Sequence, residues 1–74
     1  MITEQQVKDA IIAAGIDVDV SSIGPKDNLG DYGLDSLDFF NLFLEIEDIG
    51  GKKILDENID KMNTIETIIQ FYAD

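Results

Sequence analysis

The segment from Ser36 to Ile49 most strongly limits what this chain can form. Its sequence, SLDFFNLFLEIEDI, spaces apolar residues at helical intervals and runs into Gly50 and Gly51, and glycines favour the end of a helix. At about 100° per residue, one set of apolar side chains forms an arc wide enough for a core face. That set is Phe39, Leu42, Phe43, Ile46 and Ile49. The segment is therefore predicted to be an amphipathic helix packed against the rest of the chain.

The same helix carries a second apolar face, formed by Leu37, Phe40 and Leu44, nearly opposite the first. A small helical domain can bury only one of these faces well. The second apolar face has two interpretations. In one, a short helix or the long loop covers it; in the other, it is exposed and docks a partner. Exposed apolar patches rimmed by polar groups are typical of protein interfaces. The predicted rim consists of Asp38, Asn41, Glu47 and Asp48.

The N-terminal part of the chain predicts a helix followed by a long loop. Thr3 and Gln6 match a capping box at the start of the helix, and Gly15 is expected to end it. Its apolar face is Val7, Ala10, Ile11 and Ala14. From Gly15 to about Asp35, glycines and the single proline indicate loop, and loops of roughly 20 residues are often functional. Five apolar residues can pin this loop to the core: Ile16, Val18, Val20, Ile23 and Leu29.

The C-terminal part predicts two more helices. A short one begins at Asp56, and a longer one follows Asn63, which is expected to be its N-cap with Glu66 completing a capping box. Ile65, Ile68, Ile69 and Tyr72 give the last helix an apolar stripe. No segment shows the sustained alternation of a strand. The expected fold is an all-α four-helix bundle, with three main helices, a short third helix and a long first loop, in a single domain of residues 1–74.

The charge of the chain narrows its expected partners and location. Sixteen acidic residues face only five basic ones, all lysines, giving a formal net charge of −11. Such a surface repels nucleic acids and anionic membranes and favours partners with basic patches. The N-terminus lacks a signal-peptide pattern and no stretch is long enough to span a bilayer. We expect a cytoplasmic monomer.

The missing residue types argue against an enzyme. The chain has no histidine and no cysteine, which removes the usual general base, the thiol nucleophile and the commonest zinc ligands. A serine hydrolase is excluded further because no G-x-S-x-G elbow is present. An EF-hand beginning at Asp17 would place Ser22 at the required glycine and Asn28 at the required glutamate. Catalysis and calcium binding are therefore both disfavoured.

Ser36 has two interpretations. In the first, Asp35 or Ser36 caps the free N–H groups of Leu37 and Asp38, and acids in the first turn complement the helix dipole. In the second, the Ser36 hydroxyl is an attachment point for a phosphate ester, which would face unpaired N–H groups at the positive end of the dipole.

The stretch GLDSLDFFNLFLEIED, in an acidic chain of helices with a long first loop, resembles the acyl carrier protein family. The D-S-L signature of the family matches Asp35, Ser36 and Leu37, and Gly33 matches the glycine that usually precedes it. The resemblance covers nearly the whole chain. It implies that Ser36 carries a 4'-phosphopantetheine arm, donated from coenzyme A by a Mg²⁺-dependent phosphopantetheinyl transferase. The thiol of the arm would then hold acyl groups as thioesters.

The resemblance also implies that the helix after Ser36 is the recognition helix, with Asp35 and Asp38 helping to dock the transferase and other enzymes. Some positions depart from the common pattern: Phe40 replaces valine, Asn41 replaces glutamate, and Gly50 replaces a core aromatic. Lys52 and Lys53 also follow where acids are common. A bulkier, less acidic recognition face favours a dedicated pathway with its own ligase, synthase or acyltransferase. Phe39 and Phe43 are either plain core residues or fill the space where some members shelter an acyl chain.

Two other functions remain open. One is a free-standing aminoacyl or D-alanyl carrier loaded by an adenylating ligase, although peptidyl carriers more often have glycine or histidine just before the serine, where this chain has Asp35. The other is an unmodified acidic protein-interaction module.

Overall fold

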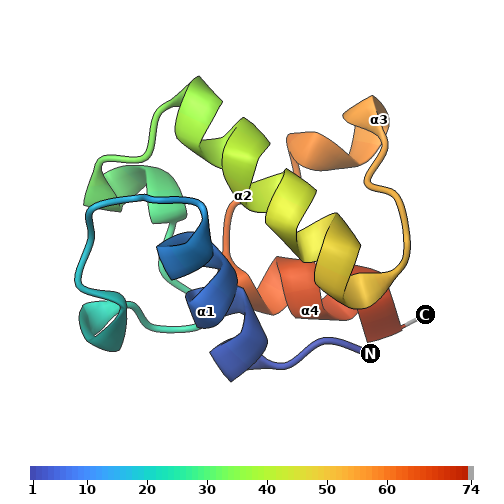
Figure 1. Cartoon of the computed structure of the whole chain (residues 1–74), viewed down its shortest axis with the longest axis horizontal. Coiled ribbons are helices and arrows are strands. Elements are labelled where there is room, and N and C mark those ends of the chain that lie inside the picture. Colours follow the sequence, from blue (N-terminus) through green and yellow to red (C-terminus); the bar gives the residue numbers. More distant parts are fainter. Residues whose placement is uncertain (74) are drawn as a thin grey trace.

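The fold consists of helices joined by loops. The computed structural model describes residues 1–73, and these contain four α-helices, two short 3₁₀ helices and no strand (Figure 1). The elements are α1 (Glu4–Ala13), η1 (Val20–Ser22), η2 (Leu29–Tyr32), α2 (Ser36–Gly50), α3 (Asp56–Ile59) and α4 (Ile65–Ala73). The predicted all-α class, with three longer helices and a short third one, is confirmed. Within residues 1–73, no helix is long and apolar enough to cross a membrane.

Helix α1 begins as its sequence predicts. The Thr3 hydroxyl accepts the N–H of Gln6 at 3.2 Å, and the Gln6 side chain accepts the N–H of Thr3 at 2.9 Å. This reciprocal box pairs two N–H groups that a helix start leaves free. At the other end, Ala14 is the C-cap and Gly15 adopts a left-handed φ of 77°.

The long connection between α1 and α2 was predicted as loop throughout and contains the two 3₁₀ helices instead. Asp19 caps η1 and Asn28 caps η2 through their side-chain oxygens. Ile23 and Leu29 are buried, and the Leu29 N–H donates to the carbonyl of Asn63 at 2.8 Å. Three other residues of the segment pack partly buried against the core, as expected: Ile16, Val18 and Val20.

The predicted cap of α4 is wrong by one residue. The Thr64 hydroxyl, and not the Asn63 side chain, accepts a free N–H of the first turn, that of Thr67, at 3.1 Å, and the Thr67 hydroxyl accepts the Thr64 N–H at 3.2 Å. Glu66 does not complete the box; its N–H donates to the carbonyl of Pro25. Threonine and asparagine are both good caps, so two adjacent candidates left the choice to the tertiary contacts.

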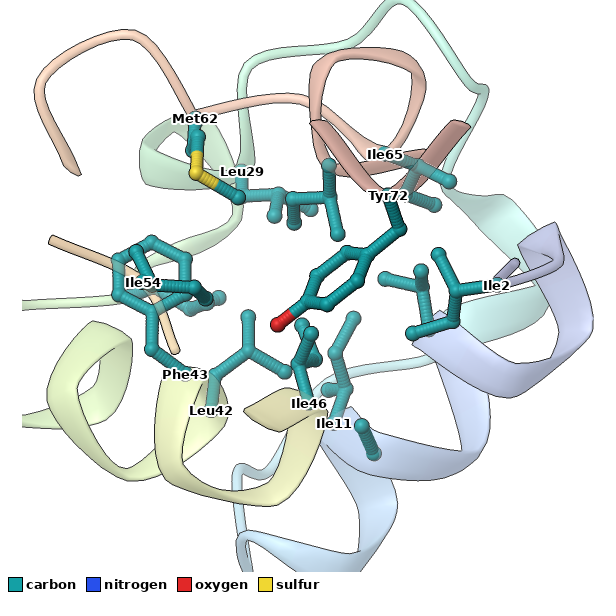
Figure 2. Close-up of a cluster of buried hydrophobic side chains, with 14 of the residues drawn as sticks. Ile2, Ile11, Leu29, Leu42, Phe43, Ile46, Ile54, Met62, Ile65 and Tyr72 are labelled. Carbon is teal, nitrogen blue, oxygen red and sulfur yellow. The ribbon is translucent and has the colours of Figure 1, made fainter. Parts of the chain in front are cut away.

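The core lies where α1, α2 and α4 meet. The fully or nearly fully buried residues of these helices are Val7, Ala10, Ile11, Leu42, Phe43, Ile46, Ile65, Ile68 and Tyr72. Figure 2 shows the Tyr72 ring among them, extending toward Leu42 and Ile46 of α2. Ile49 was predicted on this face but is 40% exposed. The buried residues of α2 end at Ile46, and Ile49 lies at the edge of the arc in the last turn.

The end of α2 is fitted to α4. A Cβ atom at Gly50 would overlap the ring of Tyr72, so glycine provides the space that the ring occupies. The Tyr72 hydroxyl donates to the carbonyl of Lys52 at 2.7 Å. Burial first, and the nearby Glu47 carboxylate second, raise the pKa of Tyr72 to about 12. Lys52 lies 4.3 Å from the Phe71 ring centre.

Candidate functional site

Ser36 is the first residue of α2 and is exposed. Asp35 rather than Ser36 caps the helix: its carboxylate accepts the Asp38 N–H at 2.9 Å, and the Asp38 carboxylate accepts the Asp35 N–H at 3.1 Å. Within residues 1–73, no hydrogen bond involves the Ser36 hydroxyl. The two aspartates therefore complete the helix start, and the hydroxyl remains free for chemistry.

The chain reaches Ser36 through a fixed turn. Gly33 adopts φ of 92°, a left-handed conformation that favours glycine, and its N–H donates to the carbonyl of Gly30. Leu34 is then buried, 7% exposed. The turn and this anchor bring the next residues, Asp35 and Ser36, to the surface.

A second contact holds the loop before this turn. The Tyr32 hydroxyl donates to the Asp27 carboxylate at 2.6 Å, and the Ser22 carbonyl oxygen lies 3.1 Å from the same hydroxyl. The hydrogen bond from Tyr32 lowers the pKa of Asp27 and, reciprocally, raises the pKa of Tyr32. Because Tyr32 ends η2, the bond ties η2 back to the preceding part of the loop.

A cavity of about 380 Å³ opens beside Ser36. It is lined by Ser36, Phe39, Phe40, Phe43, Ile59, Asp60 and Asn63. A second cavity, of about 210 Å³, continues along α2 toward Lys53 and shares Phe40, Phe43 and Ile59 with the first. We call the two together the α2–α3 groove, because residues of these helices form most of its walls. It is mainly apolar, with polar groups at its edge.

The second apolar face of α2 is exposed, which agrees with the second of the two interpretations given for it. Leu37 is 66%, Phe40 58% and Leu44 50% exposed. Among its acids, Asp35 and Asp48 are exposed, whereas Asp38 and Glu47, like Asn41, are partly buried. Helix α3 therefore does not cover this face.

Some neighbouring features were not found from the sequence. Leu55 is 51% and Ile59 36% exposed, and Ile59 lines both cavities together with Phe40 and Phe43 of α2. The Glu47 carboxylate accepts the N–H of Ile54 at 2.6 Å, so this acid also has a structural contact. Helix α3 has only four residues, which is too short for periodicity to show on which face Ile59 lies.

The site suits a covalently attached phosphate-linked group. A hydroxyl that is exposed, outside the capping box and beside an apolar cavity can be esterified without loss of an internal contact. A family model described as a phosphopantetheine attachment site matches residues 7–72, which include all the helices except the first residues of α1 and the last residue of α4. The chain therefore belongs to the phosphopantetheine-attachment family of carrier proteins, which includes the acyl carrier proteins and whose members hold a covalent 4'-phosphopantetheine group.

Proposed function

We propose that this chain is an acyl carrier protein whose 4'-phosphopantetheine arm is attached to Ser36. The observation that supports this most directly is the free Ser36 hydroxyl at the start of α2, outside the Asp35–Asp38 box and at the mouth of the α2–α3 groove. In this proposal the chain has no catalytic activity of its own and presents its cargo to enzymes.

The arm supplies a thiol that holds an acyl group as a thioester, which the protein, having no cysteine, lacks. The residues of the chain have the other tasks. Asp35 and Asp38 keep the helix start intact around the modified serine. Phe39, Phe40 and Ile59 offer an apolar wall beside it.

The partners proposed are a phosphopantetheinyl transferase and an acyl ligase, synthase or acyltransferase, each with a basic docking patch. The exposed second apolar face would supply much of the affinity, and the surrounding acids would steer and orient the partner. The docking set is Asp35, Leu37, Asp38, Phe40, Asn41, Leu44, Glu47 and Asp48. The bulky Phe40 and the uncharged Asn41 favour a dedicated lipid or secondary-metabolite pathway.

An aminoacyl cargo is the competing possibility. The mainly apolar lining of the cavity beside Ser36 favours an acyl group, because an alkyl chain would gain burial against Phe39, Phe40 and Ile59. Loading by candidate adenylating ligases, with acyl and aminoacyl substrates offered together, distinguishes the two. A purely aminoacyl product would overturn the acyl assignment and leave the arm itself unaffected.

Incubation with coenzyme A and a permissive transferase should add one phosphopantetheine to the intact mass. Ser36→Ala should abolish this addition while changing the free energy of unfolding by less than about 1 kcal/mol, because Asp35 is the cap. An unmodified mass, under conditions that convert a control carrier, would reject the attachment site. Ser21 and Ser22 are the other serines, so Ser22→Ala is a matched control.

A further inference from the structure

Helix α3 has few contacts of its own that hold it in place. Of its described residues, Asp56–Ile59, none is buried, and its N-cap Leu55 makes no side-chain capping bond. Buried residues flank it instead: Ile54 is 6% and Met62 2% exposed, and Figure 2 shows both in the core cluster with Phe43. The position of α3 therefore depends on how these two flanking residues are fixed.

The Glu47 side chain holds the backbone of Ile54. One carboxylate oxygen of Glu47 accepts the Ile54 N–H at 2.6 Å, in a partly buried setting. A carboxylate is a stronger acceptor than a carbonyl, and partial burial strengthens the bond further. Glu47 lies in the last turn of α2, so this single bond joins α2 directly to the residue that leads into α3.

The same contact affects the groove beside Ser36. Ile59 of α3 lines both cavities, and Asp60, which follows it, lines the one at Ser36. Glu47, Ile54 and Asp56 line the second cavity. Movement of α3 away from α2 would widen both cavities at once.

We propose that Glu47 is a positioning residue for the α2–α3 groove: its carboxylate holds α3 in place, and a basic side chain of a docking enzyme that pairs with this carboxylate releases α3 and opens the groove. The first half stands on the geometry alone. The second half rests on the proposed function, because it requires an enzyme that docks on α2.

Competition for Glu47 is physically reasonable. The carboxylate is partly exposed and borders Leu44 and Phe40, the centre of the proposed docking surface. An arginine or lysine brought there would form a charge-assisted bond to the same oxygens, and the Ile54 N–H is a weaker, neutral donor. Partner binding and groove opening would then be coupled through one side chain.

Amide hydrogen exchange on the isolated protein tests the first half. Glu47→Ala should speed exchange of the Ile54 and Asn58 amides about tenfold, the order expected when such a bond is lost. Glu47→Gln retains an acceptor oxygen and should largely restore protection. Asp48→Ala removes the same charge from the next, exposed residue and should leave both amides as in the wild type. The core amides of Ile11 and Ile68 report whether the change is local.

Two results would reject this half. One is wild-type exchange at Ile54 and Asn58 in Glu47→Ala. The other is equally fast exchange of both amides in Asp48→Ala, which would mean that loss of negative charge at this end of α2, and not loss of the bond to Ile54, loosens α3. Because Asn58 donates to the Leu55 carbonyl, its amide reports on α3 itself and not only on the broken bond.

The second half is tested in a complex. The Ser36→Ala protein cannot be modified but retains the docking surface, so it can be saturated with a phosphopantetheinyl transferase. The Ile54 and Asn58 amides should exchange several-fold faster in the complex, although most of the interface becomes protected. Increased protection at both amides would overturn the coupling.

Failure of the coupling is distinguishable from failure of the proposed function. If the wild-type protein gains a phosphopantetheine and Ser36→Ala binds the transferase, the function stands whatever α3 does. If neither occurs, the carrier assignment fails, and the exchange results for Glu47 in the isolated protein still decide whether it positions α3.

Discussion

The two sides of α2 carry similar apolar residues but differ sharply in burial. The side toward α1 and α4 presents Leu42 and Ile46, both fully buried. The side toward α3 presents Phe40 and Leu44, each at least half exposed, and borders both cavities. The residue types are similar, so apolar character alone does not reveal which side stabilises the fold.

The difference shows how one helix of a small chain can supply a core face and still leave a second apolar face exposed. Helices α1 and α4 pack against one side and exclude water from it, whereas α3 is too short to cover the other. The apolar residues left on the α3 side therefore give up burial in the free protein and can regain it against a partner. The predictions below test this division of α2, beginning with the largest effect on stability.

Truncating one side chain on each side of α2 should give the clearest difference between the two sides. Ile46→Ala should lower the free energy of unfolding by about 2–5 kcal/mol, because it removes a fully buried side chain. Leu44→Ala should change it by less than about 0.5 kcal/mol and lower kcat/KM with the transferase at least about fivefold. Urea denaturation and steady-state kinetics provide the two readouts. Marked unfolding of Leu44→Ala would place that residue in the core.

Gly50→Ala tests how closely the end of α2 fits against α4. The new Cβ overlaps the Tyr72 ring, and overpacking of this kind costs about 1–3 kcal/mol, partly offset by up to about 1 kcal/mol from the helix propensity of alanine. Urea denaturation should show net destabilisation. In a Tyr72→Ala background the cost should disappear. An equal cost in both backgrounds would mean that the ring is not the obstacle.

Tyr72→Phe removes the bond to the Lys52 carbonyl and should cost about 1 kcal/mol at neutral pH. The pKa of Tyr72 is about 12 in the folded protein, against an ordinary 10.0. A raised pKa contributes stability that is complete below pH 10 and is lost as the pH rises toward 12. The wild type should therefore lose stability across this range more steeply than Tyr72→Phe. Parallel pH profiles of the two denaturation midpoints would contradict the burial of this phenol.

The smallest effect concerns the helix that supports the buried side. Thr64→Ala should cost about 1 kcal/mol or less, because it removes the α4 cap. Asn63→Ala should cost under about 0.5 kcal/mol, since only the Asn63 backbone carbonyl makes the contact with Leu29. Thermal unfolding followed by circular dichroism suffices. A larger loss of stability in Asn63→Ala than in Thr64→Ala would mean that Asn63 is the N-cap, as the sequence pattern predicts.

Local signals in the sequence predicted the parts of the fold that depend on neighbours along the chain. The Thr3–Gln6 box, the start of α2 at Ser36 and its end at the glycine pair are set by residues within one helical turn. The second apolar face of α2 was also predictable, because helical periodicity separates it from the core face, whereas periodicity left open whether that face is covered or exposed. Ile49 was misplaced since periodicity gives a direction but not how far the packing helices extend.

Contacts between distant segments were not predictable in the same way. The Glu47–Ile54 bond requires the chain to turn back after α2, and the Gly50–Tyr72 fit joins residues 22 apart in the chain. The two 3₁₀ helices were missed because three or four residues show no period. At the site, the position of Ser36 could be predicted, whereas the cavity beside it depends on where α3 lies.

The reciprocal Asp35–Asp38 bonds also have a practical consequence. Since the helix start depends on those two side chains and not on position 36, Ser36→Cys should give a folded protein with one thiol, in a chain otherwise free of cysteine. Maleimide dyes, spin labels or mechanism-based crosslinkers would then couple at a single, exposed and known point. The proposed attachment position would thus also serve as a single site for chemical conjugation.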